Sequence, residues 1–329
     1  PPGRVQPPIL DSFAGLAYLN SRFLWNDLKA STDVGGSAPG APPARLRKYE
    51  QARVLGGGSA INGQLANRGA PHDYDEWQAL GASGWTWDTV LPYFRKLERD
   101  VDFDGPLHGQ DGPIPISRIG EDLWPGHARA MARAFAQAGF DAVDDQNGAF
   151  VDGYFPVAIS NLYDRRVSTA IGYLGYRVRA RPNLTLKTDT HVTRLLMQGR
   201  RCIGVMAQGP DGVEKRHLAQ EVILASGALH SPAHLLRAGI GPAEDLRRLG
   251  IEVVADRPGV GRRLMDHPSV AVASFIAPEA RINGVTRRHL MLGLRFSSGM
   301  GDAPQGDMAA SIASKSAWHD VGSQLATVN

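Results

Sequence analysis

The run of three glycines at positions 56–58 constrains the fold more than any other feature of the sequence. Glycine has no Cβ atom, so a backbone made of it can turn sharply and approach a ligand closely. Ser59 and Asn62 follow, and both residue types are common at helix starts, where free N–H groups favour a bound phosphate. The run therefore predicts a loop that leads into a helix start. By itself it is equally compatible with a plain structural turn and with a phosphate-binding loop.

The length of 329 residues predicts one large domain or two interlocked domains, because the chain exceeds what one small core needs. Hydrophobic residues make up 43%, which is enough for a packed interior. The net charge is only +3 and the basic residues are scattered. We therefore expect neither nucleic acid nor an anionic membrane as a partner.

Cysteine content and apolar runs exclude further classes of protein. The single Cys202 rules out an intrachain disulfide framework and a Cys-rich zinc site, and its strand-like surroundings predict a buried thiol. No apolar run reaches the roughly 18 residues that a membrane span needs. No signal peptide is visible, so we expect a cytoplasmic protein.

Helical patterns lie mainly in the first half of the chain. One helix is expected to start at Pro71 and another at Asp88, which can cap it. The spacing of apolar residues predicts a third helix over 124–140, ended by Gly139. The acidic stretch 141–153 lacks the ligand spacing of a calcium site, which favours a solvated loop.

Strand patterns follow from residue 183 onward, where the hydrophobic period changes to two and predicts an antiparallel meander. The apolar run 221–225 is typical of a buried parallel strand. A small-residue turn at 226–228 follows it, and Ser231-Pro232 then opens a helix. Together these form a second place where a dinucleotide could lie close to the backbone.

The first motif of the chain resembles a signature of the glucose–methanol–choline family of flavin oxidoreductases. It runs from Ala52 to Asn62 and continues through Ala66, Gly69 and Asp73-Tyr74-Asp75.

A second motif, at 227–232 with Leu235 and 239–242, resembles another signature of the same family. His234 and Ala238 depart from its usual form, but the glycines and the Ser-Pro helix start remain.

The resemblance implies a mixed α/β and α+β fold with two partial domains. The first is an incomplete three-layer FAD/NAD(P)-binding domain with a β-meander, expected at residues 1–115 and 176–268. The second is a substrate-binding domain built on an antiparallel sheet, expected at residues 116–175 and 269–329. Strand-like stretches at 270–276 and 308–312 fit that sheet.

The resemblance also implies FAD as the cofactor. Members with covalently bound flavin carry His at the position of Asn62, so non-covalent binding is implied here. The implied cofactor-binding residues are Gly56, Gly57, Ser59, Asn62, Gly63, Gln64, Leu65, Val192, Ala225, Ser226 and Gly227.

These residues are implied to serve different parts of FAD. The glycine run and Ser59 would line the flavin or the diphosphate, and residues 62–65 would lie near the isoalloxazine. Val192 would meet the adenine through its backbone, and residues 225–227 would pass the adenosine half. Ser59 and Asn62 also fit a role as helix caps. His267 is implied to close the flavin pocket and not to act as a base, and we expect no catalytic or metal-binding residue in this chain.

Two elements of the family are missing from the sequence. No Gly-x-Gly-x-x-Gly opens a helix, and the chain ends at Asn329, before the family's segment with the catalytic histidine. The chain also starts with Pro1 and not with Met. The resemblance thus implies an internal fragment of a longer enzyme, which we expect to be inactive by itself.

The activity implied for the parent protein is the oxidation of a primary alcohol. A C–H bond next to the hydroxyl gives a hydride to flavin N5, while a histidine outside this chain takes the hydroxyl proton. Within the family, the sequence resembles bacterial alcohol oxidases and dehydrogenases of the 5-hydroxymethylfurfural oxidase and choline dehydrogenase-like types. A hydroxynitrile lyase on the same fold and an inactive binding module are the alternatives. The expected partners are a small-molecule alcohol and O2 or another electron acceptor; the sequence indicates neither the acceptor nor the oligomeric state.

Overall fold

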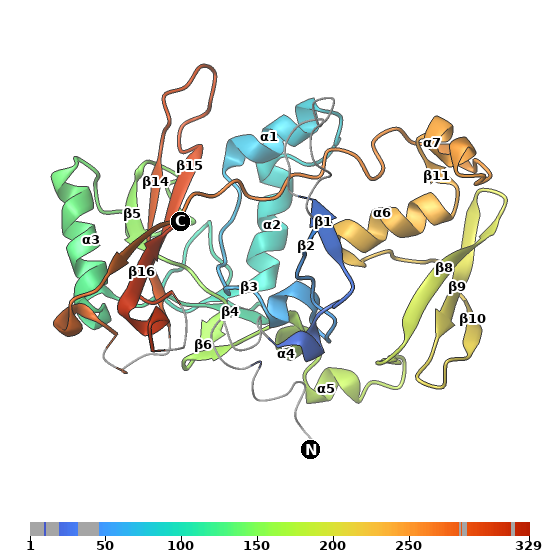
Figure 1. Ribbon diagram of the computed structural model, residues 1–329, viewed down its shortest axis with the longest axis horizontal. Coiled ribbons are helices and arrows are strands. Elements are labelled where there is room, and N and C mark those ends of the chain that lie inside the picture. The colour runs from blue at the N-terminus through green and yellow to red at the C-terminus, as the bar shows by residue number, and fades with distance from the viewer. Residues whose placement is uncertain (1–9, 11–19, 32–45, 283, 285–287, 317–319) are drawn as a thin grey trace. The chain divides into compact units, whose positions relative to one another are not determined.

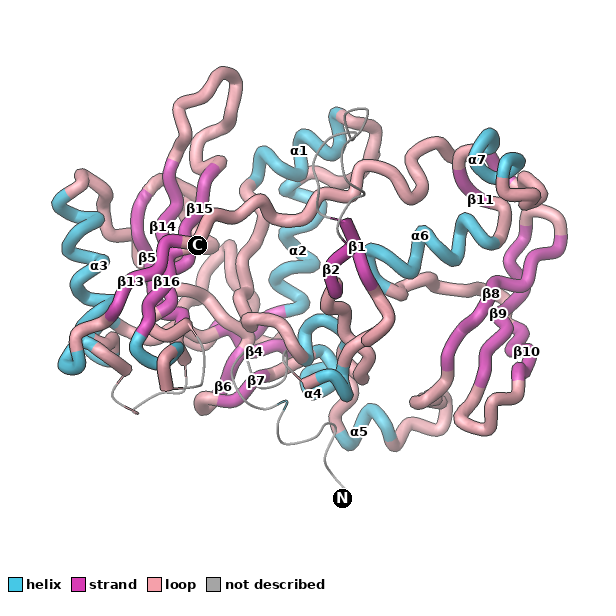
Figure 2. Tube along the Cα trace, in the orientation of Figure 1, coloured by secondary structure: helices cyan, strands magenta, loops and turns pink. Residues whose placement is uncertain are grey.

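The chain divides into two compact units, which Figure 1 shows as a ribbon. The computed structural model describes residues 10, 20–31, 46–282, 284, 288–316 and 320–329. The first unit comprises Pro1–Leu184 and Ser269–Asn329, and the second comprises Thr185–Pro268. Residues 1–9, 11–19 and 32–45 of the expected FAD-binding domain lie outside the described residues. Figure 2 shows that helices, strands and loops alternate along both units, as the mixed fold class predicted.

The first unit is built on a five-stranded antiparallel sheet with the strand order β13-β16-β15-β14-β5. Its strands are β5 (Gly153–Pro156), β13 (Val272–Phe275), β14 (Leu290–Phe296), β15 (Met308–Ala313) and β16 (Leu325–Val328). The antiparallel sheet expected after residue 269 is therefore present, with β5 added at its edge from the middle of the chain.

Helix α3 (Gly126–Gln137) packs on this sheet (Figure 1) and forms with it an apolar core. Ala128 and Ala132 of the helix contact a cluster that contains Met291, Leu292 and Ile312. The helix is shorter than the predicted 124–140, because Pro125 is its N-cap and Gly139 adopts a φ of 92°.

Helices α1 (Pro71–Ala79) and α2 (Trp87–Leu97) pack together through aromatic side chains. The ring of Tyr74 lies 5.9 Å from the rings of both Trp87 and Phe94. Helix α1 starts at Pro71 as predicted. The cap of α2 is Thr86 and not Asp88, because the hydroxyl of Thr86 accepts the N–H of Thr89.

Shorter elements complete the first unit. The remaining strands pair as β1 (Lys29–Ser31) with β2 (Leu46–Lys48), β3 (Glu98–Asp100) with β4 (Ile114–Ile116), and β6 (Asn161–Leu162) with β7 (Arg165–Arg166). The unit also contains helices α4 (Thr169–Tyr173) and α5 (Tyr176–Arg179) and the 3-10 turns Ser21–Phe23, Gly57–Ala60, Glu121–Leu123, Pro278–Ala280 and Gly322–Gln324.

The second unit contains the predicted antiparallel meander. Its strands β8 (His191–Gln198), β9 (Arg201–Gln208) and β10 (Glu214–Leu218) follow the order β10-β9-β8. Helix α6 (Gly227–Arg237) contacts β8 and also β11 (Ile240–Gly241). Strand β11 pairs in parallel with β12 (Ala255–Asp256), and α7 (Ala243–Arg248) lies between these two strands in the sequence. Cys202, expected to be buried, is half-buried in β9.

The predicted buried strand at 221–225 is wrong. No strand in the described part of the chain pairs with this segment, and the side chain of Ile223 is 85% exposed. A continuous apolar run becomes a buried strand only when neighbouring strands cover it. Helix α6 also begins earlier than expected, at Gly227 instead of Ser231.

Within the parts of the chain that the structure describes, every helix is too short or too polar to cross a membrane.

The core between α3 and the sheet makes a direct prediction about stability. Leu292 is fully buried there, so Leu292→Ala should lower the free energy of unfolding by about 2–5 kcal/mol in a urea titration. Val272 is 66% exposed on an edge strand of the same sheet, so Val272→Ala should change it by less than about 0.5 kcal/mol. Equal losses in the two variants would contradict this core.

Candidate functional site

The glycine loop, defined as residues 54–62, depends on two glycines with left-handed backbones. Gly56 has a φ of 93° and Gly57 a φ of 55°. A Cβ atom on Gly56 would come within 3.1 Å of the Cβ of Ala170, whereas a Cβ on Gly57 or Gly58 would meet no atom of the described residues within 4 Å. Gly56 is therefore needed for packing, and Gly57 and Gly58 border open space that a ligand could approach.

The loop leads into a single 3-10 turn, Gly57–Ala60, and not into an α-helix start. The residue before the turn is Gly56, and no side chain caps it. The hydroxyl of Ser59 donates to the carbonyl of Gly56 (2.6 Å) and accepts the N–H of Thr169 (3.0 Å). The interpretation of Ser59 and Asn62 as helix caps is therefore wrong, because both side chains tie this segment to its own surroundings.

Arg166, on β7, holds the end of the loop from inside the first unit. Its guanidinium donates to the carbonyl of Ser59 (3.0 Å), the side-chain oxygen of Asn62 (2.9 Å) and the carbonyl of Asn62 (2.6 Å). Only 1% of Arg166 is exposed, and burial lowers the pKa of its guanidinium to about 10. Arg166 is not among the residues predicted from the sequence, since nothing in the local sequence distinguishes it from the exposed Arg165 beside it.

The segment after the loop joins a small region of buried polar groups. Gln64 is fully buried with a φ of 66°, and its side-chain oxygen accepts the Nδ2 of Asn161 (2.8 Å). Leu65 forms an isolated bridge with Ile159, and the nearest neighbour of Gly63 is Leu290, at 3.9 Å from an ideal Cβ. The structure thus brings the predicted residues 56–65 together in one continuous segment.

The other predicted cofactor contacts belong to the second unit. Val192 pairs with Ala207 in the meander. Ala225, Ser226 and Gly227 are exposed just before α6, where Gly227 has a φ of 82° and open space around it. This bend therefore also leaves its backbone accessible.

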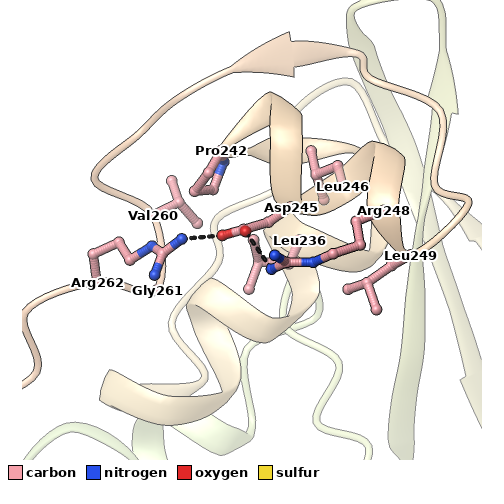
Figure 3. Close-up of a pocket in the computed structure, with 9 residues that line it drawn as sticks. All are labelled: Leu236, Pro242, Asp245, Leu246, Arg248, Leu249, Val260, Gly261 and Arg262. Carbon is pink, nitrogen blue, oxygen red and sulfur yellow. Dashed lines mark hydrogen bonds and ion pairs between the residues drawn. The ribbon is translucent and has the colours of Figure 1, made fainter. Parts of the chain in front are cut away.

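A cavity of about 260 Å³ opens between α6 and α7 of the second unit (Figure 3). Asp245 is its main charged group, and its carboxylate pairs with both Arg248 and Arg262. The other lining residues are Leu236, Pro242, Leu246, Leu249, Val260 and Gly261. Because the charges of the cavity pair with one another, we do not select it as the functional site.

A buried group of ionisable side chains surrounds His108 in the first unit. Glu98, Asp100 and His108 place their ligand atoms close enough together for a metal ion. The Nδ1 of His108 lies 3.1 Å from Asp100 and 3.2 Å from Glu98, and its Nε2 lies 2.8 Å from Asp145. The solvated loop predicted at 141–153 is therefore wrong in part, because Asp145 belongs to this cluster and Gln146 and Asn147 are buried.

Two arginines already form ion pairs with the carboxylates of this His108 cluster. Arg68 pairs with Glu98, and Arg118 bridges Asp100 (2.9 Å) and Asp145 (2.8 Å). The three carboxylates of the cluster thus pair with two guanidinium groups and a protonated imidazole, and Asp102 lies 3.6 Å from Arg118 at its edge. This arrangement is an ion-pair network, and a divalent cation would have to displace those groups.

The pKa values follow from these contacts. Hydrogen bonds to Asp100, Asp145 and Glu98 raise the pKa of His108 from 6.5 to about 11, although burial opposes the change. Burial alone would raise the pKa of Asp100, but the hydrogen bond from His108 and the charge of Arg118 lower it to about 2.

Comparison with known proteins gives the class of the chain. A family model described as GMC oxidoreductase matches residues 33–269. The chain belongs to the GMC oxidoreductase family.

Individual relatives agree with this assignment. The chain is 50% identical over 266 residues to 5-(hydroxymethyl)furfural oxidase of Methylovorus sp. (strain MP688). This match covers 79% of this chain and 50% of the relative. It is 39% identical over 255 residues to mitochondrial choline dehydrogenase of Mus musculus, covering 77% of this chain and 42% of the relative. The chain thus spans about half the length of the curated relatives that it matches.

Solved structures show the same fold. The structure of pyridoxine 4-oxidase from Mesorbium loti is 26% identical with a TM-score of 0.81, and the match covers 98% of this chain and 63% of that one. A formate oxidase from Aspergillus oryzae, studied for its FAD modification, is 22% identical with a TM-score of 0.83. This match covers 98% of this chain and 65% of the oxidase.

The His108 cluster predicts how stability depends on pH. The pKa of His108 is higher in the folded than in the unfolded protein, so its protonation stabilises the fold. This contribution is complete below pH 6.5 and is lost as the pH rises toward 11. Asp100 acts in the opposite sense, and its contribution is lost as the pH falls from 3.8 through about 2. The free energy of unfolding should therefore fall between pH 6.5 and 10 in the wild type.

The variant His108→Gln tests the cause of this decline. It should lower stability by about 3–5 kcal/mol at pH 6.5, because it leaves buried carboxylates unbalanced. It should also flatten the decline above pH 6.5, as measured by urea titrations at several pH values. An unchanged slope would show that His108 is not the titrating group. The exposed His72, 43% accessible, provides the control His72→Gln.

Proposed function

We propose that the complete protein to which this chain belongs is an FAD-dependent oxidoreductase acting on the CH–OH group of primary alcohols. The observation that carries the proposal is the glycine loop, whose Gly57 and Gly58 leave open space beside the backbone. Membership of the GMC oxidoreductase family supports it, as do relatives that are named as oxidases or dehydrogenases of alcohols.

The residues of this chain fit a flavin dinucleotide in several respects. At Gly57, Gly58 and Gly227 an added Cβ would have no atom of the described residues within 4 Å. Next to the loop, the Nε2 of the buried Gln64 is a donor without a partner among the described residues. We assign to FAD the contacts Gly56, Gly57, Ser59 and residues 62–65 in the first unit, and Val192 and residues 225–227 in the second. The corresponding division into an FAD-binding and a substrate-binding domain stays a prediction.

The chain's own role would be to bind and orient the cofactor. Bound FAD supplies the chemistry of accepting a hydride from the carbon that bears the hydroxyl. The group that removes the hydroxyl proton is proposed to be a histidine outside this chain. We also propose that FAD is held non-covalently. The residue at position 62 is Asn62, whose carboxamide is not a nucleophile and accepts hydrogen bonds from Gln64 and Arg166. The electron acceptor, O2 or another carrier, and a cytoplasmic location stay predictions.

An anaerobic reduction experiment tests the proposed function. The purified complete protein should show the absorbance of oxidised flavin, and a primary alcohol such as 5-hydroxymethylfurfural should bleach it. Denaturation with acid should release the flavin, since no covalent bond is expected. A protein that stays colourless after incubation with FAD would contradict the proposal. Cyanide release from a cyanohydrin without bleaching would indicate a hydroxynitrile lyase instead.

The variant Gly58→Ala tests the role of the loop. Gly58 needs no left-handed backbone, so an added methyl group should leave the melting temperature of the apoprotein within about 2 °C. The same methyl group should weaken FAD binding by roughly tenfold or more, because it occupies the space that a close-lying cofactor needs. The control is Gly175→Ala, whose Cβ would meet only one atom, at 3.9 Å. Equal FAD affinities in the two variants would contradict the assigned contact.

A further inference from the structure

The interior behind the glycine loop holds a positive charge that no carboxylate among the described residues pairs with. Arg166 is 1% exposed, and its acceptors in the described part of the chain are three neutral oxygens of Ser59 and Asn62. Burial lowers the pKa of Arg166, and no acidic group among the described residues raises it. A buried charge is costly unless it is paired, so this arrangement calls for a negative partner.

The unsatisfied atoms beside Arg166 have the same character. Among the described residues, the Nε of Arg166 and the Nε2 of Gln64 are buried without partners, and both are hydrogen-bond donors. The two side chains are linked through Asn161, which bonds to Gln64 and lies opposite Arg166 in the β6–β7 pair. The described residues of this region therefore lack an acceptor or an anion.

A second buried guanidinium in this region does have acidic neighbours. Arg288 donates to Asn161 (2.9 Å) and Ser117 (3.1 Å). Asp164 lies 3.8 Å from its Nε, and the charges of Asp164 and Asp102 both raise its pKa.

The His108 cluster in the same unit shows the opposite arrangement. There the buried arginines Arg68 and Arg118 each contact carboxylates directly. Arg166 has no such contact among the described residues, and it lies where the backbone of Gly57 and Gly58 borders open space.

We propose that Arg166 is a positioning residue that shapes the glycine loop and whose charge, unpaired with any carboxylate of the described residues, attracts an anionic group bound against it. This rests on the proposed function, in which FAD binds at the loop. The anion is then either the diphosphate of FAD or the flavin ring when it holds the electrons taken from the substrate. Both share the same chemistry, a negative charge placed beside the main chain of residues 56–62.

The test separates the charge of Arg166 from its shape. Arg166→Gln removes the charge, and Arg166→Lys keeps it but loses the planar fork. Arg165→Gln is the matched control, because Arg165 is exposed on the same strand and its loss changes the net charge equally. The complete protein is stripped of FAD, and the dissociation constant for FAD is measured by fluorescence and the midpoint potential of the bound flavin by dye-linked titration.

The Gln variant should bind FAD roughly tenfold or more weakly than the wild type, while the Lys variant stays within about threefold and the control within about twofold. An unchanged potential in the Gln variant identifies the diphosphate as the anion. A potential lowered by about 30 mV or more identifies the reduced ring, since that shift corresponds to tenfold weaker binding of reduced than of oxidised flavin in a two-electron couple.

Two results would overturn this inference while leaving the proposed function intact. In the first, the wild type binds FAD and the Gln and Lys variants lose FAD affinity by the same factor. The shape of the Arg166 side chain would then matter and its charge would not. The other is affinity equal to the control in both variants. A wild type that binds no FAD would instead refute the proposed function.

The Lys variant keeps the inference testable if Arg166→Gln fails to fold. A buried lysine loses its proton at a lower pH than an exposed one. The FAD affinity of Arg166→Lys should therefore fall as the pH rises from 7 to 9, while that of the wild type stays level. A level profile for the Lys variant would overturn the inference.

Discussion

The hydrogen bonds from Arg166 to the carbonyls of Ser59 and Asn62 are the contacts on which the candidate site depends. Three successive glycines have little preference for one shape, so the loop needs an external restraint. Arg166 supplies it from β7, more than one hundred residues further along the chain. Ser59 and Thr169 tie the beginning of the loop to the start of α4 in the same way.

The two buried charge systems of the first unit lie at the two ends of one segment. Arg166 holds residue 62, and the His108 cluster holds the backbone near residue 68, where Asn147 accepts the N–H of Arg68 and donates to the carbonyl of Ala66. Asn147 is itself fixed by Asp145 of the cluster. The segment between these anchors contains Gln64 and Leu65, which pair with the strand-like residues 159–161. Residues assigned to FAD are thereby anchored by hydrogen bonds on both sides.

The sequence allowed some of this architecture to be predicted. Local signals were sufficient for the left-handed Gly56 and Gly57, for the start of α1 and for the meander, because backbone freedom and hydrophobic period act over a few residues. Family motifs identified the class. The strand predicted at 221–225 was wrong because its partners decide whether an apolar run is paired and buried.

Arg166 and the His108 cluster could not be predicted for a different reason. Arginine, aspartate and glutamate are usually exposed, so their burial depends on partners that are distant in the sequence. Glu98 and Arg68 are thirty residues apart, and Arg166 and Asn62 are 104 apart. The acidic stretch at 141–153 has the composition of a solvated loop, and only the tertiary contact with Arg118 and His108 buries Asp145.

The central claim is that the glycine loop receives FAD through its main chain. Hydrogen–deuterium exchange of the complete protein, with and without FAD, measures this at the level of backbone amides. The account predicts that amides of residues 56–62 and of residues 225–227 become protected when FAD is added, while those of the α3 helix do not change. Protection confined to other segments, with residues 56–62 exchanging at the same rate in both states, would contradict it.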